Sequence, residues 1–151
     1  INTYALGHPE FLTEAAKEFG SQCIVLFIEA KQQQNGTYEA YTDGGREHSG
    51  VDAIEWAQRG IELGVGEILI SSIDCDGTRK GFDTELIRRI SAFASIPVIA
   101  HGGAGSMESC VAAVREGKAD ALSASSVFHY GDFSIRELKN YLHKNDIPIR
   151  L

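Results

Sequence analysis

Glycines and serines follow two apolar stretches in the second half of the sequence, and this combination is typical of a phosphate site. His101 precedes Gly102-Gly103-Ala104-Gly105, and Ser125-Ser126 follows the mostly apolar stretch at 119–124. Glycine lets the backbone approach a ligand closely, and the start of a helix after such a loop offers unpaired N–H groups. Two such loops on neighbouring strands therefore bind a phosphate dianion without basic side chains. Alternatively, the glycines only make a tight turn, and His101, to which we assign no catalytic role, only hydrogen-bonds a neighbouring loop.

Acidic side chains after two other apolar stretches are candidates for proton transfer. Glu29 follows the apolar run at 23–28, where a carboxylate is costly to bury unless it is paired or functional. Lys31 is the alternative partner, in a simple ion pair. Asp74 and Asp76 lie two residues apart before a Gly-Thr pair, and either can act in acid–base chemistry or cap a turn.

Apolar runs alternate with helical patterns along the chain, and these elements must position the candidate residues. Four βα units in series predict an α/β fold with parallel strands, the first strand being buried on both faces. Chemistry in such folds gathers at the carboxyl ends of the strands, so we expect the candidate residues to converge there. The expected strands are 23–28, 67–70, 97–100 and 119–124, the expected helices are 11–19, 53–63, 84–93, 107–116 and 134–142, and a small hairpin is expected around 37–42.

Composition excludes several classes of protein. The 151 residues carry a formal net charge of -7, which disfavours nucleic acid as a partner because binding it requires clustered basic side chains. No apolar run approaches the roughly 20 residues of a membrane span. The three cysteines are far apart in an odd number, which argues against a disulfide framework or a zinc site and fits a reducing compartment. We therefore expect one domain over residues 1–151 in the cytoplasm, with neither metal nor cofactor.

Several motifs resemble the cyclase subunit of imidazole glycerol phosphate synthase. The resemblance is carried by the stretches 66–78, 81–83, 99–105 and 125–129, with weaker likeness at 1–3 and 20–22, and it covers essentially the whole chain. It implies an eight-stranded βα barrel (a TIM barrel), of which this chain is the carboxyl-terminal half, from the end of strand 4 through helix 8. Since the complete fold needs about 250 residues, we expect the chain to be a fragment.

The resemblance also implies an activity and site residues. Members of the family are lyases of histidine biosynthesis. They use ammonia from a glutaminase subunit, with which they form a heterodimer, to convert a phosphoribulosyl aminoimidazole carboxamide intermediate into imidazole glycerol phosphate and aminoimidazole carboxamide ribotide. Glu29 matches the acid–base residue of this half, where many members have Asp, and the second acid would lie on the absent first strand. The matching substrate and phosphate positions are Asp76, Gly77, Gly102, Gly103, Ser125 and Ser126, with Asn2 and Ser71 nearby.

Two other functions stay open from the residues alone. One is a paralogous cyclase of another amidotransferase pathway, such as surface-sugar amidation. The other is a non-catalytic phosphate-binding half-barrel. In each case four strands cut from a barrel leave unpaired edges and an exposed apolar face, so we expect self-association of the half-barrel and no turnover by this chain alone.

Overall fold

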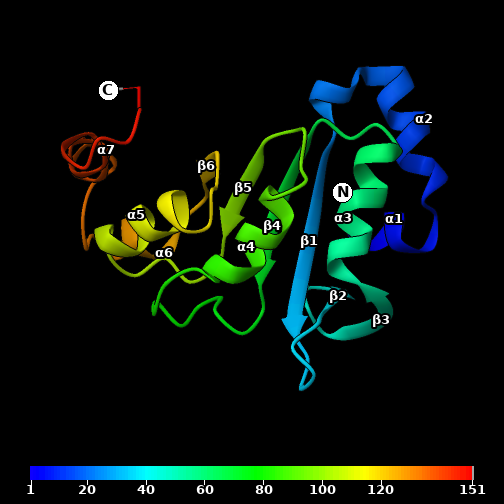
Figure 1. Ribbon diagram of the computed structural model, residues 1–151, viewed down its shortest axis with the longest axis horizontal. Coiled ribbons are helices and arrows are strands. Elements are labelled where there is room, and N and C mark those ends of the chain that lie inside the picture. Colours follow the sequence, from blue (N-terminus) through cyan, green and yellow to red (C-terminus); the bar gives the residue numbers. More distant parts are fainter. Residues whose placement is uncertain (151) are drawn as a thin grey trace.

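The structure, a computed structural model, describes residues 1–150 and contains one sheet of six strands (Figure 1). The spatial order is β3-β2-β1-β4-β5-β6, and β1, β4, β5 and β6 are parallel neighbours in chain order. This succession is that of a βα barrel, whereas a doubly wound sheet reverses its order. The strands are β1 Val25–Gln32, β2 Tyr38–Thr42, β3 Glu47–Asp52, β4 Glu67–Ser72, β5 Val98–His101 and β6 Ala121–Leu122.

Helices follow the parallel strands and pack beside one another, α3 against α4, α4 against α5, and α5 against α7. Four of these helices begin at a residue whose side chain accepts a hydrogen bond from the first turn, namely Asp52, Asp83, Ser106 and Ser134. The helices are α1 Thr3–Gly7, α2 Glu10–Phe19, α3 Ala53–Glu62, α4 Thr84–Ser91, α5 Met107–Arg115, α6 Ser126–His129 and α7 Ile135–Lys144, with a 3-10 turn η1 at Ser21–Cys23.

The predicted α/β architecture of four βα units is confirmed. The polar excursion after β1 forms β2 and β3, which pair antiparallel and place β2 against β1. The predicted strand at 119–124 is shorter, since β6 contains only Ala121–Leu122, and α6 begins at Ser126 inside the predicted serine loop. None of the helices in residues 1–150 combines the length and apolar character that crossing a membrane requires.

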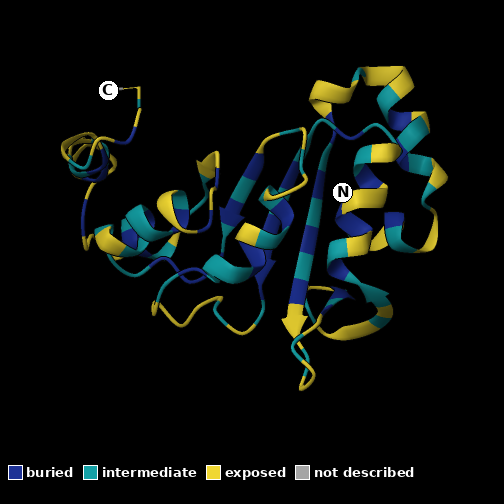
Figure 2. Cartoon of the chain, in the orientation of Figure 1, coloured by how far each residue is buried: buried dark blue, intermediate teal, exposed yellow. Residues whose placement is uncertain are grey.

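The two faces of the parallel sheet are covered unequally, so the prediction that the first strand is buried on both faces is wrong. Buried and half-buried residues alternate along β1, as Figure 2 shows. Leu26 and Ile28 are buried in the core under the helices, but Phe27 on the opposite face is only half-buried. Phe27 pairs in register with Leu69, which pairs with Ile99, and both are also half-buried. An apolar row therefore crosses the open face.

Candidate functional site

The carboxyl-terminal part of the open face carries a second row, and this row is polar. Glu29 pairs in register with Ser71, and Ser71 pairs with His101. His101 continues the row to Ser123, since its Nδ1 lies 3.2 Å from the Ser123 Oγ. Successive residues of a strand point to opposite faces, so residues in register at these positions share one face. The site thus spans β1, β4 and β5 and reaches the residue that follows β6.

Glu29 is held by two hydrogen bonds from distant parts of the chain. Asn2 Nδ2 donates to Oε2 of Glu29 over 2.6 Å, and the backbone N–H of Gly45 donates to the same carboxylate. Asn2 is brought there because the backbone of Ile1 hydrogen-bonds to β1, with Phe27 N donating to Ile1 O over 2.9 Å. Within residues 1–150, Oδ1 of Asn2 is buried without a hydrogen-bond partner. The carboxylate is therefore oriented by neighbours on both sides.

Burial raises the pKa of the Glu29 carboxyl above its ordinary value, and the charge of Asp76 adds to the rise. The hydrogen bonds from Asn2 and Gly45 and the nearness of His101 oppose it, because they favour the ionised form. A carboxyl with a raised pKa is suited to both accepting and donating a proton near neutral pH. The ion-pair alternative fails, since no salt bridge joins Glu29 to Lys31 in the part of the chain described. The Lys31 ammonium lies instead 6.0 Å from the centre of the Tyr41 ring.

Sequence reasoning missed Gly45, which lies in the turn between β2 and β3. Asp43, Gly44 and Gly45 all have positive φ angles, of 53°, 68° and 77°. Asp43 N donates to the Thr3 Oγ1 over 3.0 Å, so the turn contacts the segment that carries Asn2. The paired glycines are the signal in the sequence for such a turn, but only the fold shows that it closes over Glu29.

Beside this row lies a cavity of about 250 Å³ formed by three loops. The loops follow β4, β5 and β6, as expected for the phosphate-binding residues. Asn2 and Ser71 lie outside the lining, Asn2 against Glu29 and Ser71 in the polar row. The lining contains six predicted residues, Asp76, Gly77, Gly102, Gly103, Ser125 and Ser126, together with Arg79, His101, Ala104, Ser123 and Ala124.

Two of the loops touch so closely that only glycine fits between them. A Cβ on Gly103 would lie 2.1 Å from the carbonyl oxygen of Gly81, and one on Gly105 would lie 1.7 Å from that of Arg79. Gly81 N also donates to Gly103 O over 2.8 Å. Gly103 therefore lines the cavity, and Gly103 and Gly105 together let the loop after β4 pack onto the loop after β5.

The two aspartates of the loop after β4 have separate environments. Asp74 Oδ2 accepts a hydrogen bond from the backbone N–H of Gln32 at 2.9 Å, which ties the loop to the end of β1. Asp76 lines the cavity and lies close enough to Glu29 to influence its pKa. Only Asp76 therefore belongs to the candidate site.

Arg79 is a cation of the cavity that sequence reasoning missed. Its guanidinium forms an ion pair with Asp132 and lies 5.9 Å from the centre of the Tyr130 ring. The pair joins the loop after β4 to the segment after α6. The only signal in the sequence is a basic residue directly after the Gly-Thr pair.

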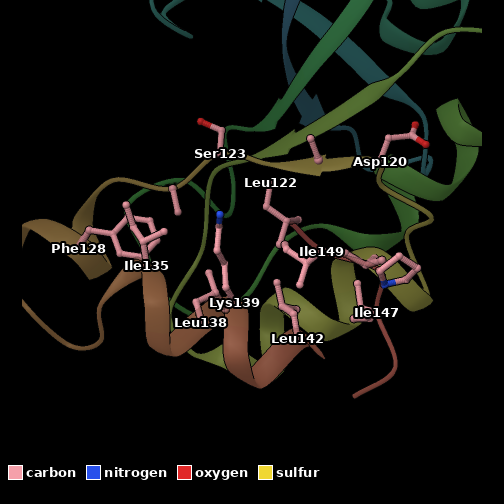
Figure 3. A pocket seen from close by; sticks show the side chains of 14 residues that line it. Asp120, Leu122, Ser123, Phe128, Ile135, Leu138, Lys139, Leu142, Ile147 and Ile149 are labelled. Carbon is pink, nitrogen blue, oxygen red and sulfur yellow. The ribbon is translucent and has the colours of Figure 1, made fainter. Parts of the chain in front are cut away.

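A larger, mainly apolar cavity of about 660 Å³ lies between β6 and α7 (Figure 3). Leu122, Leu138 and Leu142 line it, and Lys139 and Asp120 are its charged members. Asp120 already accepts a hydrogen bond from Val98 N over 2.9 Å. The lining of this cavity does not bring together side chains that could perform acid–base chemistry. Residues 1–150 contain no cluster of three or more His, Cys, Asp or Glu side chains that is arranged to bind a metal ion.

Comparisons with known proteins show the family to which the chain is related. The family model described as histidine biosynthesis protein matches residues 1–134. The chain is 49% identical, over 152 residues, to the imidazole glycerol phosphate synthase subunit HisF of Lachnoclostridium phytofermentans. The alignment covers 100% of this chain but 59% of that relative, so the chain spans less than two thirds of the relative's length.

Proposed function

Since the chain belongs to the histidine biosynthesis protein family, we propose that it is the carboxyl-terminal half of an imidazole glycerol phosphate synthase cyclase subunit. The observation that carries the proposal is the adjacency of two features on one edge of the sheet. Glu29, with its raised pKa, stands at one end of the polar row, and the three-loop cavity lies at the other. One substrate can therefore reach both.

In this proposal the cavity binds a phosphate of the substrate through the backbone N–H groups of its loops and the Ser126 hydroxyl. Fixing that end places the reacting carbons over the polar row, which removes much of the entropic cost of proton transfer. Glu29 then accepts and returns protons during the addition of ammonia and the closure of the imidazole ring.

The open face supports the half-barrel assignment. Four parallel strands in chain order, with a half-buried apolar row on one face, resemble half of a closed barrel. The other half would cover this row, pair with the free edge of β6 and supply the second acid. Light scattering tests whether the chain alone covers the face by self-association, and a monomer that stays soluble would contradict that.

The full enzyme, in this proposal, works in the cytoplasm as a heterodimer with a glutaminase that delivers ammonia. We expect no turnover by the chain alone, because the second acid and half of the substrate site are absent. Combining it with the amino-terminal half of the Lachnoclostridium relative tests the function. Ammonia-dependent turnover of the ribulosyl intermediate should appear, and Glu29→Gln should lower it by 100-fold or more, within the usual range for losing an acid–base group, about 10²–10⁴.

Glu47→Gln is the matched control, since Glu47 is exposed on β3. A stable complex of the two halves that binds phosphate but shows no turnover would contradict the cyclase and indicate a non-catalytic phosphate-binding half-barrel. Turnover that requires a different amidated substrate would indicate the paralogous pathway.

A further inference from the structure

We propose that His101 is an anion-binding group of the three-loop cavity, and that its ring takes up a proton from solvent when the phosphate group binds. This inference rests on the proposed phosphate site and adds to it His101, to which the sequence alone assigns no catalytic role. It follows from the position of His101, the orientation of its ring and the charges around it.

His101 occupies the junction between the two parts of the site. It is the last residue of β5, directly before Gly102, and its side chain lines the cavity. On its other side it is the register partner of Ser71, next to Glu29. His101 is half-buried, so a bound anion would screen it from water. No other histidine lines this cavity among the described residues.

Two contacts fix the orientation of the imidazole ring. Nδ1 lies 3.2 Å from the Ser123 Oγ, and the ring meets that of Phe27 edge to face, with 6.2 Å between their centres. Residues 1–150 offer no hydrogen-bond partner to Nε2. A ring that is held at Nδ1 and free at Nε2 can donate from Nε2 to an incoming oxygen, and as an imidazolium it does so with a full positive charge.

The charges that face His101 make protonation on binding favourable. From β1 it faces Glu29, and from the loop after β4 it faces Asp76 and Arg79, whereas the loop after β6 contributes only the neutral Ser123. The charge of Arg79 is already paired with Asp132. A phosphate dianion would therefore enter a cavity with surplus negative charge, and an imidazolium at position 101 supplies the missing positive charge.

Sulfate is the probe that tests this, because its charge stays constant over the range in which histidine titrates. Anion binding that prefers the imidazolium is tight below the pKa of the ring and weakens as pH rises through it. We expect the sulfate affinity of the chain to fall about tenfold between roughly pH 5.5 and 8, since hydrogen bonds to charged groups are worth at least that factor. In His101→Gln the change should be less than about twofold.

NMR titration of the histidine rings gives a readout that does not depend on a variant folding. Saturating sulfate should move the ring signals of His101 toward those of the imidazolium, and His143→Gln, an exposed change on α7, should leave the response intact. Glu29→Gln is the second control, because it removes the carboxyl that faces His101, and the pH dependence of sulfate binding should persist in it. A pH dependence that persists in His101→Gln, or that disappears in Glu29→Gln while His101 does not respond to sulfate, overturns the proposal.

The same spectra separate this inference from the proposed function. Sulfate that shifts the amides of Gly103 and Ser126 without changing the titration of His101 overturns the role of His101 and leaves the phosphate site standing. Sulfate that shifts neither amide at any pH overturns both.

Discussion

Asn2 Nδ2 lies 2.6 Å from Oε2 of Glu29, so the candidate acid–base residue is oriented by a side chain 27 positions earlier in the sequence. This bond favours the ionised carboxylate and opposes the rise that burial causes in the Glu29 pKa. Removing it therefore changes both the chemistry of the site and the pH dependence of stability.

Asn2→Ala should raise the pKa of Glu29 further, as measured by following its side-chain carbon signal in an NMR pH titration. A carboxyl whose pKa is higher in the folded than in the unfolded chain binds more protons when folded, so stability falls as pH rises between those two pKa values. The variant should therefore lose stability more steeply over that window than the unchanged chain. An unchanged or lowered Glu29 pKa would contradict the role of Asn2. Thr37→Ala, in the exposed turn before β2, is the control.

Tyr38 connects the β2–β3 hairpin to α4. Its hydroxyl lies 3.2 and 3.1 Å from the two carboxylate oxygens of Asp83, whose Oδ1 also accepts from Leu86 N at the start of α4. Burial and the charge of Asp83 raise the pKa of Tyr38, so the hydroxyl remains a donor. Tyr38→Phe should lower the free energy of unfolding by about 1–3 kcal/mol, because a buried bond to a charged acceptor is lost.

Urea unfolding measures this change. Tyr130→Phe is the matched control, because Tyr130 is 70% exposed, and its effect should stay within about 0.5 kcal/mol. If the two variants had the same free energy of unfolding, the hydrogen bond between Tyr38 and Asp83 would not stabilise the packing of the hairpin against α4.

Gly103 is required by the contact between two loops. It has a φ of 98°, and a Cβ would lie 2.1 Å from the carbonyl oxygen of Gly81. Gly103→Ala should therefore cost about 2 kcal/mol or more in thermal or chemical unfolding and should weaken anion binding. Gly7→Ala should be nearly neutral, since a Cβ there would have no atom within 4 Å. Equal costs at the two positions would argue against tight packing of the loops.

Ser126 lines the cavity and begins α6. Phosphate at about 100 times its dissociation constant should stabilise the chain by about 2.7 kcal/mol, observed as a rise in melting temperature. Ser126→Asp should abolish that rise, because its carboxylate repels the anion. Ser125→Ala should keep it if the backbone N–H is the donor at position 125. A chain that phosphate does not stabilise would contradict the phosphate site.

The order of elements and most of the cavity were predictable from the sequence. Periodicity and the lengths of the apolar runs indicate four βα units, and parallel strands bring the ends of all four to one edge. Glu29, Asp76, Gly103 and Ser126 could therefore be assigned to that edge, because Glu29 directly follows an apolar run and the other three lie in the loops that follow such runs.

Contacts between residues far apart in the chain were decided only by the tertiary structure. The Gly45 N–H at Glu29, the pairing of Arg79 with Asp132, and the different environments of Asp74 and Asp76 depend on how loops meet in space, which local patterns do not encode. The uneven burial of β1 has the same origin. An apolar run indicates that a strand is stabilised by burial. Whether the second face of that strand is covered depends on which other elements pack against the sheet.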